Sequence, residues 1–103
     1  MTDIEIARNT ELKLITEIAQ NLGIQENELE QYGKYKAKIN QKSFNRLSKE
    51  KNGKLILVTA MSPTPLGEGK TTISIAVADG LRKINKKSVL ALREPSLGPV
   101  FGI

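Results

Sequence analysis

The amino-acid sequence predicts an α/β fold, in which N-terminal helices precede a βαβ unit with an incomplete parallel sheet. Two near-continuous aliphatic runs, residues 54–60 and 88–92, have the pattern of strands that are buried on both faces of a parallel sheet. Between them, apolar residues recur at helical spacing from Lys70 to Ile84. A strand, a helix and a second strand in about 40 residues make a βαβ unit, whose crossover is right-handed by default.

The first half of the chain opens with helical signals. Apolar side chains recur at helical spacing from Leu12 to Leu22, which predicts an amphipathic helix with Gly23 as its C-cap. A second, short helical turn is expected from Gln25 to Tyr32, and Gly33 ends it. These elements give residues 1–33 a mainly helical character.

An extended segment and a further helix are expected next. Residues 34–39 alternate between lysine and less polar side chains, which permits a strand or a loose extended segment. Asn40 is expected to cap a helix. Phe44 and Leu47 are expected to face inward from that helix.

The Asn52-Gly53 pair is a turn signal and marks the expected domain boundary. Residues 1–53 are expected to form a helical N-terminal segment, and residues 54–103 the start of the α/β domain. Two strands and one crossover cannot bury a parallel sheet on both faces, so this domain is expected to be truncated.

Composition excludes several kinds of chemistry. The 103 residues contain no His and no Cys, which removes disulfides, zinc sites, Cys nucleophiles and histidine general bases. The longest apolar run, residues 55–61, is far shorter than the roughly 20 residues of a membrane helix. The acidic N-terminus does not resemble a secretory signal. A cytoplasmic location without a membrane partner is therefore expected.

The net charge of +5 is unevenly distributed. Residues 1–33 hold seven acidic and two basic residues, whereas residues 34–54 hold one acidic and eight basic residues. A nucleic-acid site would use this basic stretch, with Tyr32 and Tyr35 as stacking rings. The stretch is rich in Lys and matches no nucleic-acid module, so a solvated face or a surface covering an acidic partner domain is favoured. No nucleic-acid partner is expected. The basic residues are Lys34, Lys36, Lys38, Lys42, Arg46, Lys49, Lys51 and Lys54.

A glycine-rich loop joins the first expected strand to the following helix. Its sequence, Gly67-Glu68-Gly69-Lys70-Thr71, lies at a helix N-terminus, where free N–H groups and the helix dipole attract anions. The two glycines allow the backbone to approach phosphate oxygens closely. Lys70 supplies a positive charge for the β/γ-phosphates, and Thr71 supplies a hydroxyl that can ligate Mg²⁺. This pattern indicates a phosphate-binding loop.

The start of the loop departs from the usual P-loop pattern. That pattern, G-x-x-x-x-G-K-[ST], requires glycine at position 64, where this chain has Thr64 followed by Pro65. A β-branched residue beside a proline favours extended geometry, so the front of the loop is stiffer than usual. Taken alone, the sequence G-E-G-K-T could be the start of a helix that follows a turn by chance. The strand patterns on either side of it favour a phosphate site instead.

Arg93 follows the second expected strand. Ligands of open α/β sheets bind beyond the carboxyl ends of the strands, so the Arg93 loop and the glycine-rich loop are expected side by side. Arg93 can then hold a γ-phosphate or an acyl phosphate bidentately. The alternative is a salt bridge to Glu94 or Asp79.

Two segments of the chain closely resemble the formate–tetrahydrofolate ligase family. They are residues 64–71, T-P-L-G-E-G-K-T, and residues 92–99, L-R-E-P-S-L-G-P. The likeness extends upstream through residues 3–7, 15–19 and 32–38, so it covers essentially the whole chain. In this family, the P-loop contains a proline and has Thr at the position of the first glycine.

The resemblance implies a P-loop nucleotide-binding domain and an ATP-dependent ligase of one-carbon metabolism. In this family, formate attacks the γ-phosphate of Mg-ATP to give formyl phosphate, and N10 of tetrahydrofolate then takes the formyl group. Lys70 is implied to neutralise the transferring phosphoryl group, Thr71 to help hold Mg²⁺, and Arg93 to stabilise formyl phosphate. The residues implied to bind ATP are Thr64, Pro65, Leu66, Gly67, Glu68, Gly69, Lys70 and Thr71.

The resemblance also implies that part of the enzyme lies outside these 103 residues. Full-length members are several times longer, form homotetramers and are activated by monovalent cations. The chain is therefore expected to be an N-terminal fragment, without the pterin pocket or the cation site, that does not turn over alone. Two alternatives stay open. One is a non-catalytic fragment that docks on full-length subunits, and the other is a P-loop NTPase of another family.

Overall fold

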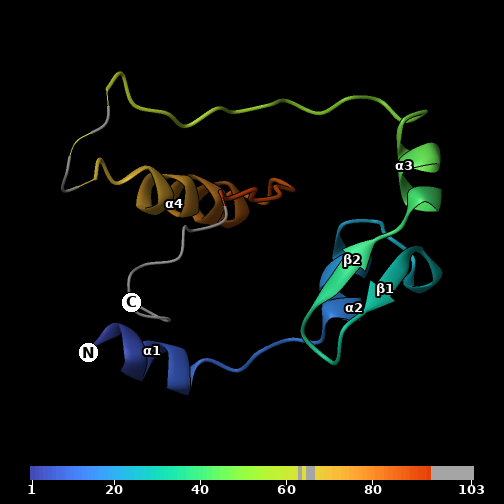
Figure 1. Cartoon of the computed structure of the whole chain (residues 1–103), viewed down its shortest axis with the longest axis horizontal. Helices are drawn as coiled ribbons and strands as arrows, with labels where there is room; N and C mark the ends of the chain where they lie inside the picture. The colour runs from blue at the N-terminus through green and yellow to red at the C-terminus, as the bar shows by residue number, and fades with distance from the viewer. Residues whose placement is uncertain (63, 65–66, 94–103) are drawn as a thin grey trace. The chain divides into compact units, whose positions relative to one another are not determined.

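A computed structural model describes residues 1–62, 64 and 67–93 of the chain (Figure 1). The chain divides into two units, Met1–Gly53 and Lys54–Ile103, and each is described by itself. The elements, in chain order, are α1 (Asp3–Asn9), α2 (Ile15–Asn21), the 3-10 turn η1 (Glu26–Glu28), β1 (Leu29–Gln31), β2 (Ala37–Ile39), α3 (Gln41–Leu47) and α4 (Lys70–Lys83). The combination of helices and a small sheet confirms the mixed α/β class.

Helix α1 is a short capped helix that the sequence analysis did not predict. The Thr2 hydroxyl accepts a hydrogen bond from the Glu5 N–H at 3.3 Å, and the Glu5 carboxylate accepts one from the Thr2 N–H at 2.7 Å. This reciprocal capping box satisfies two N–H groups that a helix start leaves without intrahelical partners. Helix α1 buries no residue, so no buried apolar face accompanies it. The T-x-x-E spacing was the strong indication in the sequence that a helix begins here.

Helix α2 confirms the predicted helix over Ile15–Asn21 and its glycine cap, whereas Leu12, where the prediction began, precedes the helix and is exposed. Gly23 has a φ of 78°, its N–H donates to the Gln20 carbonyl at 2.9 Å, and the Ile24 N–H donates to the Ala19 carbonyl at 2.9 Å. These two bonds form a Schellman motif, which requires a left-handed residue after the helix. Ala19 and Ile24 are buried beside it, whereas Ile18 of the predicted apolar face is exposed.

The hairpin β1–β2 corrects the predicted helical turn from Gln25 to Tyr32. A helical turn forms at η1, but the following residues form β1, which pairs antiparallel with β2 through Leu29 and Ile39 (Figure 1). The Tyr32 N–H donates to the Lys36 carbonyl at 2.8 Å and closes the hairpin loop. Residues 29–31 are extended because they pair with β2, which comes later in the chain. The helical spacing of apolar residues contains no information on such pairing. The expected extended segment is confirmed at β2.

Helix α3 confirms the Asn40 cap and corrects the predicted inward face. The Asn40 side chain accepts a hydrogen bond from the Ser43 N–H at 3.3 Å. Phe44 is 60% exposed and Leu47 is also exposed, whereas Ser43 is fully buried. Arg46, three residues after Ser43 and therefore on the same helix face, pairs with Glu28 of η1. Phe44, one residue after Ser43, lies on a different face of α3, and Leu47, at the last residue of the helix, stays exposed beside the Arg46 face.

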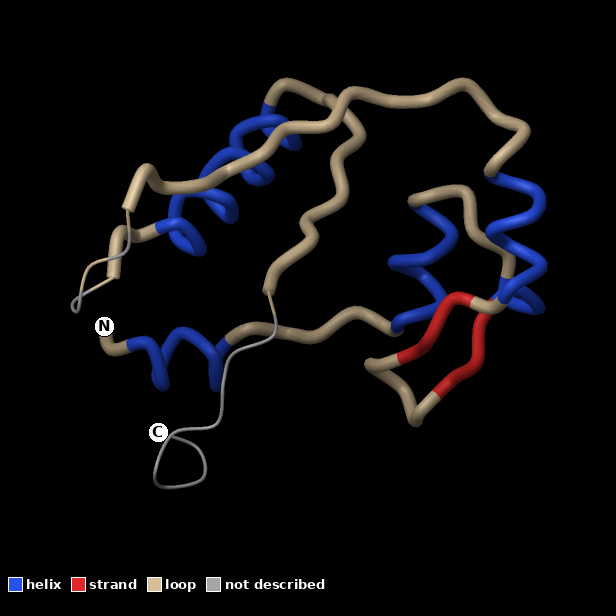
Figure 2. The backbone as a smooth tube through the Cα atoms, turned by 45° about the horizontal axis from the view of Figure 1, so that its top comes forward, coloured by secondary structure: helices blue, strands red, loops and turns tan. Residues whose placement is uncertain are grey.

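The second unit contains helix α4, as predicted from residues 70 to 84. The predicted βαβ unit and its parallel sheet are not confirmed, because residues 54–60 and 88–92 form no strand among the described residues (Figure 2). A strand needs a neighbour for its N–H and C=O groups, and a parallel strand needs apolar cover on both faces. Leu55 is 95% exposed and Leu57 is 80% exposed, so this cover is missing here.

In the part of the chain that the structure describes, no helix combines the length and the apolar content that crossing a membrane requires.

Candidate phosphate-binding loop

Two glycines with left-handed backbone shape the start of helix α4. Gly67 has a φ of 79°, and Gly69, the N-cap residue of α4, has a φ of 73° and a ψ of 20°. An L side chain is strained at such angles, which explains the use of glycine at both positions. A Cβ added at Gly67 or Gly69 would meet no described atom within 4 Å. The backbone is therefore open to a ligand at these two positions.

Lys70 and Thr71 are the first two residues of α4. The first helical hydrogen bond of α4 runs from the Ile73 N–H to the Gly69 carbonyl at 3.0 Å. The N–H groups before Ile73 therefore have no intrahelical acceptor and add to the positive end of the helix dipole. The side chain of Lys70 is 46% exposed, and Thr71 is exposed. A cation, a hydroxyl and backbone donors thus meet at one helix end.

Glu68 links the two ends of the loop. Its Oε1 accepts a hydrogen bond from the Thr64 N–H at 2.5 Å, and its Oε2 lies 2.6 Å from the Lys70 Nζ. A further pair of bonds joins Thr64 and Gly67: the Gly67 N–H donates to the Thr64 carbonyl, and the Thr64 hydroxyl donates to the Gly67 carbonyl, both at 3.2 Å. The hydrogen bond from Lys70, followed by that from the Thr64 N–H, lowers the pKa of Glu68. The carboxylate is therefore held in its charged form.

The structure brings together most of the residues that the sequence analysis assigned to the loop. Thr64, Glu68 and Lys70 are in contact, with the two glycines between them. Pro65 and Leu66 lie outside the described residues. Glu68 was predicted as a loop residue, but its contacts with Thr64 and Lys70 were not predicted. The signal for them was a carboxylate two residues before the loop lysine.

Arg93 is exposed, and among the described residues no hydrogen bond or ion pair joins it to the loop or to Asp79. Glu94, the other partner considered for Arg93, lies outside the described residues. The expected approach of Arg93 to the glycine-rich loop depends on the parallel sheet. It therefore stays a prediction.

Comparison with known proteins identifies the family. The family model described as formate–tetrahydrofolate ligase matches residues 1–103. The chain belongs to this family. It is 60% identical over 102 residues to a formate–tetrahydrofolate ligase of Thermosipho melanesiensis, covering 99% of this chain and 18% of that protein. It is 52% identical over 106 residues to one of Latilactobacillus sakei, covering 100% of this chain and 19% of that protein.

This formate–tetrahydrofolate ligase family chain therefore spans about a fifth of the length of the curated relatives that it matches. The relatives are named as ligases, so the family is an enzyme family. Family membership removes the alternative of a P-loop NTPase from another family. The loop residues 64–71 lie within the matched range.

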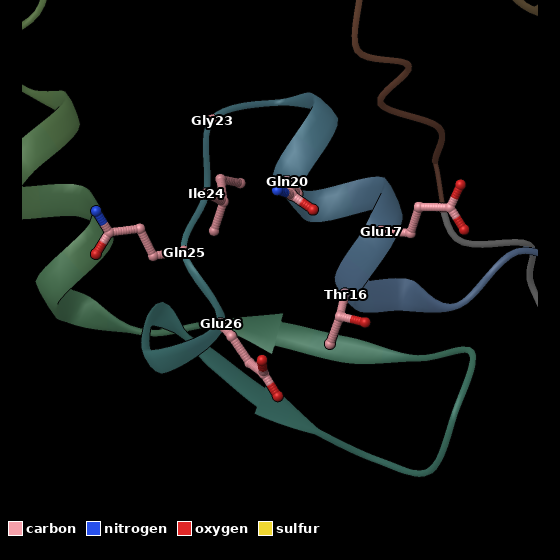
Figure 3. A pocket seen from close by; sticks show the side chains of 7 residues that line it. All are labelled: Thr16, Glu17, Gln20, Gly23, Ile24, Gln25 and Glu26. Atoms are coloured by element: carbon pink, nitrogen blue, oxygen red, sulfur yellow. The ribbon is translucent and has the colours of Figure 1, made fainter.

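A pocket of about 480 Å³ lies elsewhere in this ligase-family chain, in the first unit. Figure 3 shows its lining residues on α2, on the segment from Gly23 to Gln25 and at the first residue of η1. None of them is a predicted site residue, and the lining contains two carboxylates and no cation, which does not suit a phosphate. The lining residues are Thr16, Glu17, Gln20, Gly23, Ile24, Gln25 and Glu26.

Two lysines of the basic stretch contact the ring of Tyr32, which lies just before the stretch. The Nζ atoms of Lys36 and Lys38 lie 5.6 Å and 5.2 Å from the centroid of the Tyr32 ring. Both are cation–π contacts within the hairpin. The Tyr32 ring, which the sequence analysis considered as a base-stacking surface, therefore already has two lysine partners in this chain.

Proposed function

We propose that this chain carries the ATP loop of a formate–tetrahydrofolate ligase. The observation that carries the proposal is the start of α4, where a left-handed glycine is followed by Lys70 as the first helical residue. The family match adds the reaction class, because the relatives are named for the ligation of formate to tetrahydrofolate. In this proposal, ATP is a substrate that binds at residues 64–71.

The residues at the start of α4 have separate proposed roles. The N–H groups that follow Gly69 and the ammonium of Lys70 bind the β- and γ-phosphates, since both are donors aimed at an anion. The exposed Thr71 hydroxyl fits Mg²⁺, which prefers hard oxygen ligands, and it lies next to Lys70 on the first turn of α4. When bound, Mg²⁺ neutralises charge on the phosphate oxygens.

The proposed reaction has two steps. A formate oxygen attacks the γ-phosphorus of ATP, ADP leaves, and formyl phosphate forms. N10 of tetrahydrofolate then attacks the formyl carbon, and phosphate leaves. Phosphoryl transfer depends mostly on positioning and charge stabilisation, which suits a loop built from glycine, lysine and threonine. Arg93 is proposed to stabilise formyl phosphate through its bidentate guanidinium.

The complete reaction is proposed to need the rest of the ligase. The curated relatives are about five times as long as the matched region, so most of their chain has no counterpart here. We assign the folate pocket, the monovalent-cation site and the homotetramer contacts to that remainder. We also propose that residues 54–60 and 88–92 become adjacent parallel strands when the remaining sheet covers their exposed leucines. Residues 54–103 would then be the start of a nucleotide-binding domain.

Titration of the 103-residue chain with Mg-ATP tests the loop assignment. Amide resonances of Gly67, Gly69, Lys70 and Thr71 are expected to move, and Lys70→Ala is expected to weaken binding at least tenfold. Lys87→Ala removes the same charge outside α4 and serves as the matched control. Unchanged loop resonances in a chain whose α4 is formed would refute the proposal.

A turnover assay tests whether catalysis requires the part of the ligase that lies outside this chain. Formate-dependent release of ADP in the presence of tetrahydrofolate is expected to be absent for the isolated chain. Appreciable turnover by the pure chain would show that the proposed remainder is not needed.

A further inference from the structure

The loop already contains an anion of its own. Glu68 is bound at both carboxylate oxygens by donors of the loop, the Thr64 N–H and the Lys70 ammonium. A backbone N–H and a lysine ammonium are also the groups with which a phosphate-binding loop holds phosphate. The carboxylate thus uses the cation that the proposed function assigns to the nucleotide.

We propose that Glu68 is a built-in competitor of the nucleotide, which holds Lys70 and the Thr64 N–H until a phosphate group displaces it. The inference rests on the proposed function. It adds a regulatory contact, because Glu68 sets how strongly an anion must bind in order to free Lys70. A polyphosphate meets this requirement better than a singly charged anion, since its attraction to the ammonium is larger.

The backbone around Glu68 allows such a displacement. Glu68 lies between Gly67 and Gly69, outside α4, and an added Cβ at either glycine meets no described atom within 4 Å. The carboxylate can therefore swing away without breaking a helical hydrogen bond. A charged carboxylate that stayed in place would repel the incoming phosphates. Both arguments favour movement of Glu68 when nucleotide binds.

The same contacts also allow the opposite interpretation, in which Glu68 supports nucleotide binding, and a measurement of affinity distinguishes the two. If Glu68 were a brace that holds the loop in its binding conformation, its removal would weaken nucleotide binding. If it is a competitor, its removal strengthens binding. The direction of the change in affinity therefore decides between them.

The test measures the dissociation constant of Mg-ATP by calorimetry for the 103-residue chain and three variants. Glu68→Gln is expected to lower the constant about 3- to 10-fold, since it removes an ion pair and a repulsion. Glu68→Asp keeps the charge but is one methylene shorter, so an intermediate value is expected. Glu11→Gln changes the same net charge at an exposed position and is expected to leave the constant unchanged.

A second measurement uses the Thr64 amide resonance. In the chain without nucleotide, Glu68→Gln is expected to move this resonance toward the position that Mg-ATP produces in the unsubstituted chain. Equal or weaker binding by a folded Glu68→Gln chain overturns the inference while leaving the ATP site intact. If the unsubstituted chain itself binds no Mg-ATP, both the inference and the proposed function are refuted. If Glu68→Gln does not form α4, the comparison rests on Glu68→Asp.

Discussion

Arg46 holds both carboxylate oxygens of Glu28. Its Nε donates to Oε1 at 2.6 Å, and its Nη2 donates to Oε2 at 2.8 Å. The same Nη2 donates to the carbonyl of Gly23 at 2.9 Å, and the Gln25 N–H donates to Oε2 at 2.9 Å. This ion pair joins α3 to η1 and to the end of α2. The first unit is therefore organised around a charge pair, in which Glu28 is buried and Arg46 is partly exposed, as well as around apolar contacts.

Substitution of Arg46 is expected to loosen the whole first unit. Arg46→Lys keeps the charge but loses the two-pronged geometry, and Arg46→Ala leaves the buried Glu28 carboxylate without its cation. We expect the unfolding midpoint to fall by about 5 °C for Arg46→Lys and by more for Arg46→Ala. Thermal unfolding followed by circular dichroism measures both. The matched control is Arg8→Lys in α1, and an Arg46→Lys midpoint equal to that of the control would contradict the prediction.

The Glu28–Arg46 ion pair also predicts that the stability of the first unit falls at acid pH. The hydrogen bond from Arg46, followed by that from the Gln25 N–H, lowers the pKa of Glu28 from 4.5 to about 2. A lowered pKa in the folded state means that the unfolded chain takes up the proton more readily. The stabilisation by Glu28 is therefore complete above about pH 4.5 and is lost as the pH falls from there towards 2.

Titration of the Glu28 side-chain carbon by nuclear magnetic resonance measures this pKa directly. The protection factors of backbone amides in the first unit, which compare observed with intrinsic exchange rates at each pH, should fall across the same pH window. Glu28→Gln removes the titrating group and should abolish this part of the pH dependence. An unsubstituted chain whose exchange shows the same pH dependence as Glu28→Gln would disprove the assignment.

Ser43 predicts a substitution that does not destabilise. Its hydroxyl is fully buried and has no hydrogen-bond partner among the described residues. Removing an unsatisfied buried hydroxyl is neutral or favourable, and alanine is also a better helix former. We expect Ser43→Ala to leave stability unchanged or to raise it by up to about 1 kcal/mol. Ser48→Ala, which removes a hydroxyl that donates to the Asn45 carbonyl, is the comparison, and it should be the less stable of the two in chemical denaturation.

Local signals predicted the parts of the fold that depend on a few neighbouring residues. Gly23 and Asn40 were correctly expected as caps, because a cap depends on residues within one helical turn. The hairpin and the exposed Phe44 were not predicted, since they depend on a strand pairing and on the Glu28–Arg46 ion pair, whose residues are 18 positions apart. Helical periodicity gives no information on such contacts.

The candidate site shows the same division. The loop residues were predictable from a motif in which each residue type has a separate expected role in binding phosphate. The contacts that join Thr64 through Glu68 to Lys70 were not predictable, because a sequence does not show which donor a carboxylate binds. Pairing of residues 54–60 with 88–92 depends on apolar cover, which the exposed leucines of this structure lack.

Gly69 offers the sharpest test of the loop geometry. Its left-handed backbone should make Gly69→Ala unfavourable by about 1–2 kcal/mol, and the cost falls on the first turn of α4. Gly80→Ala is the matched control, because Gly80 lies inside the same helix, where alanine should instead stabilise by about 1 kcal/mol. Hydrogen exchange at Ile73, whose N–H donates to the Gly69 carbonyl, measures the first turn in both variants. Faster exchange in Gly69→Ala and slower exchange in Gly80→Ala are expected. If both variants protect Ile73 equally, the N-cap does not need a left-handed residue, and the loop geometry that supports the ATP site is wrong.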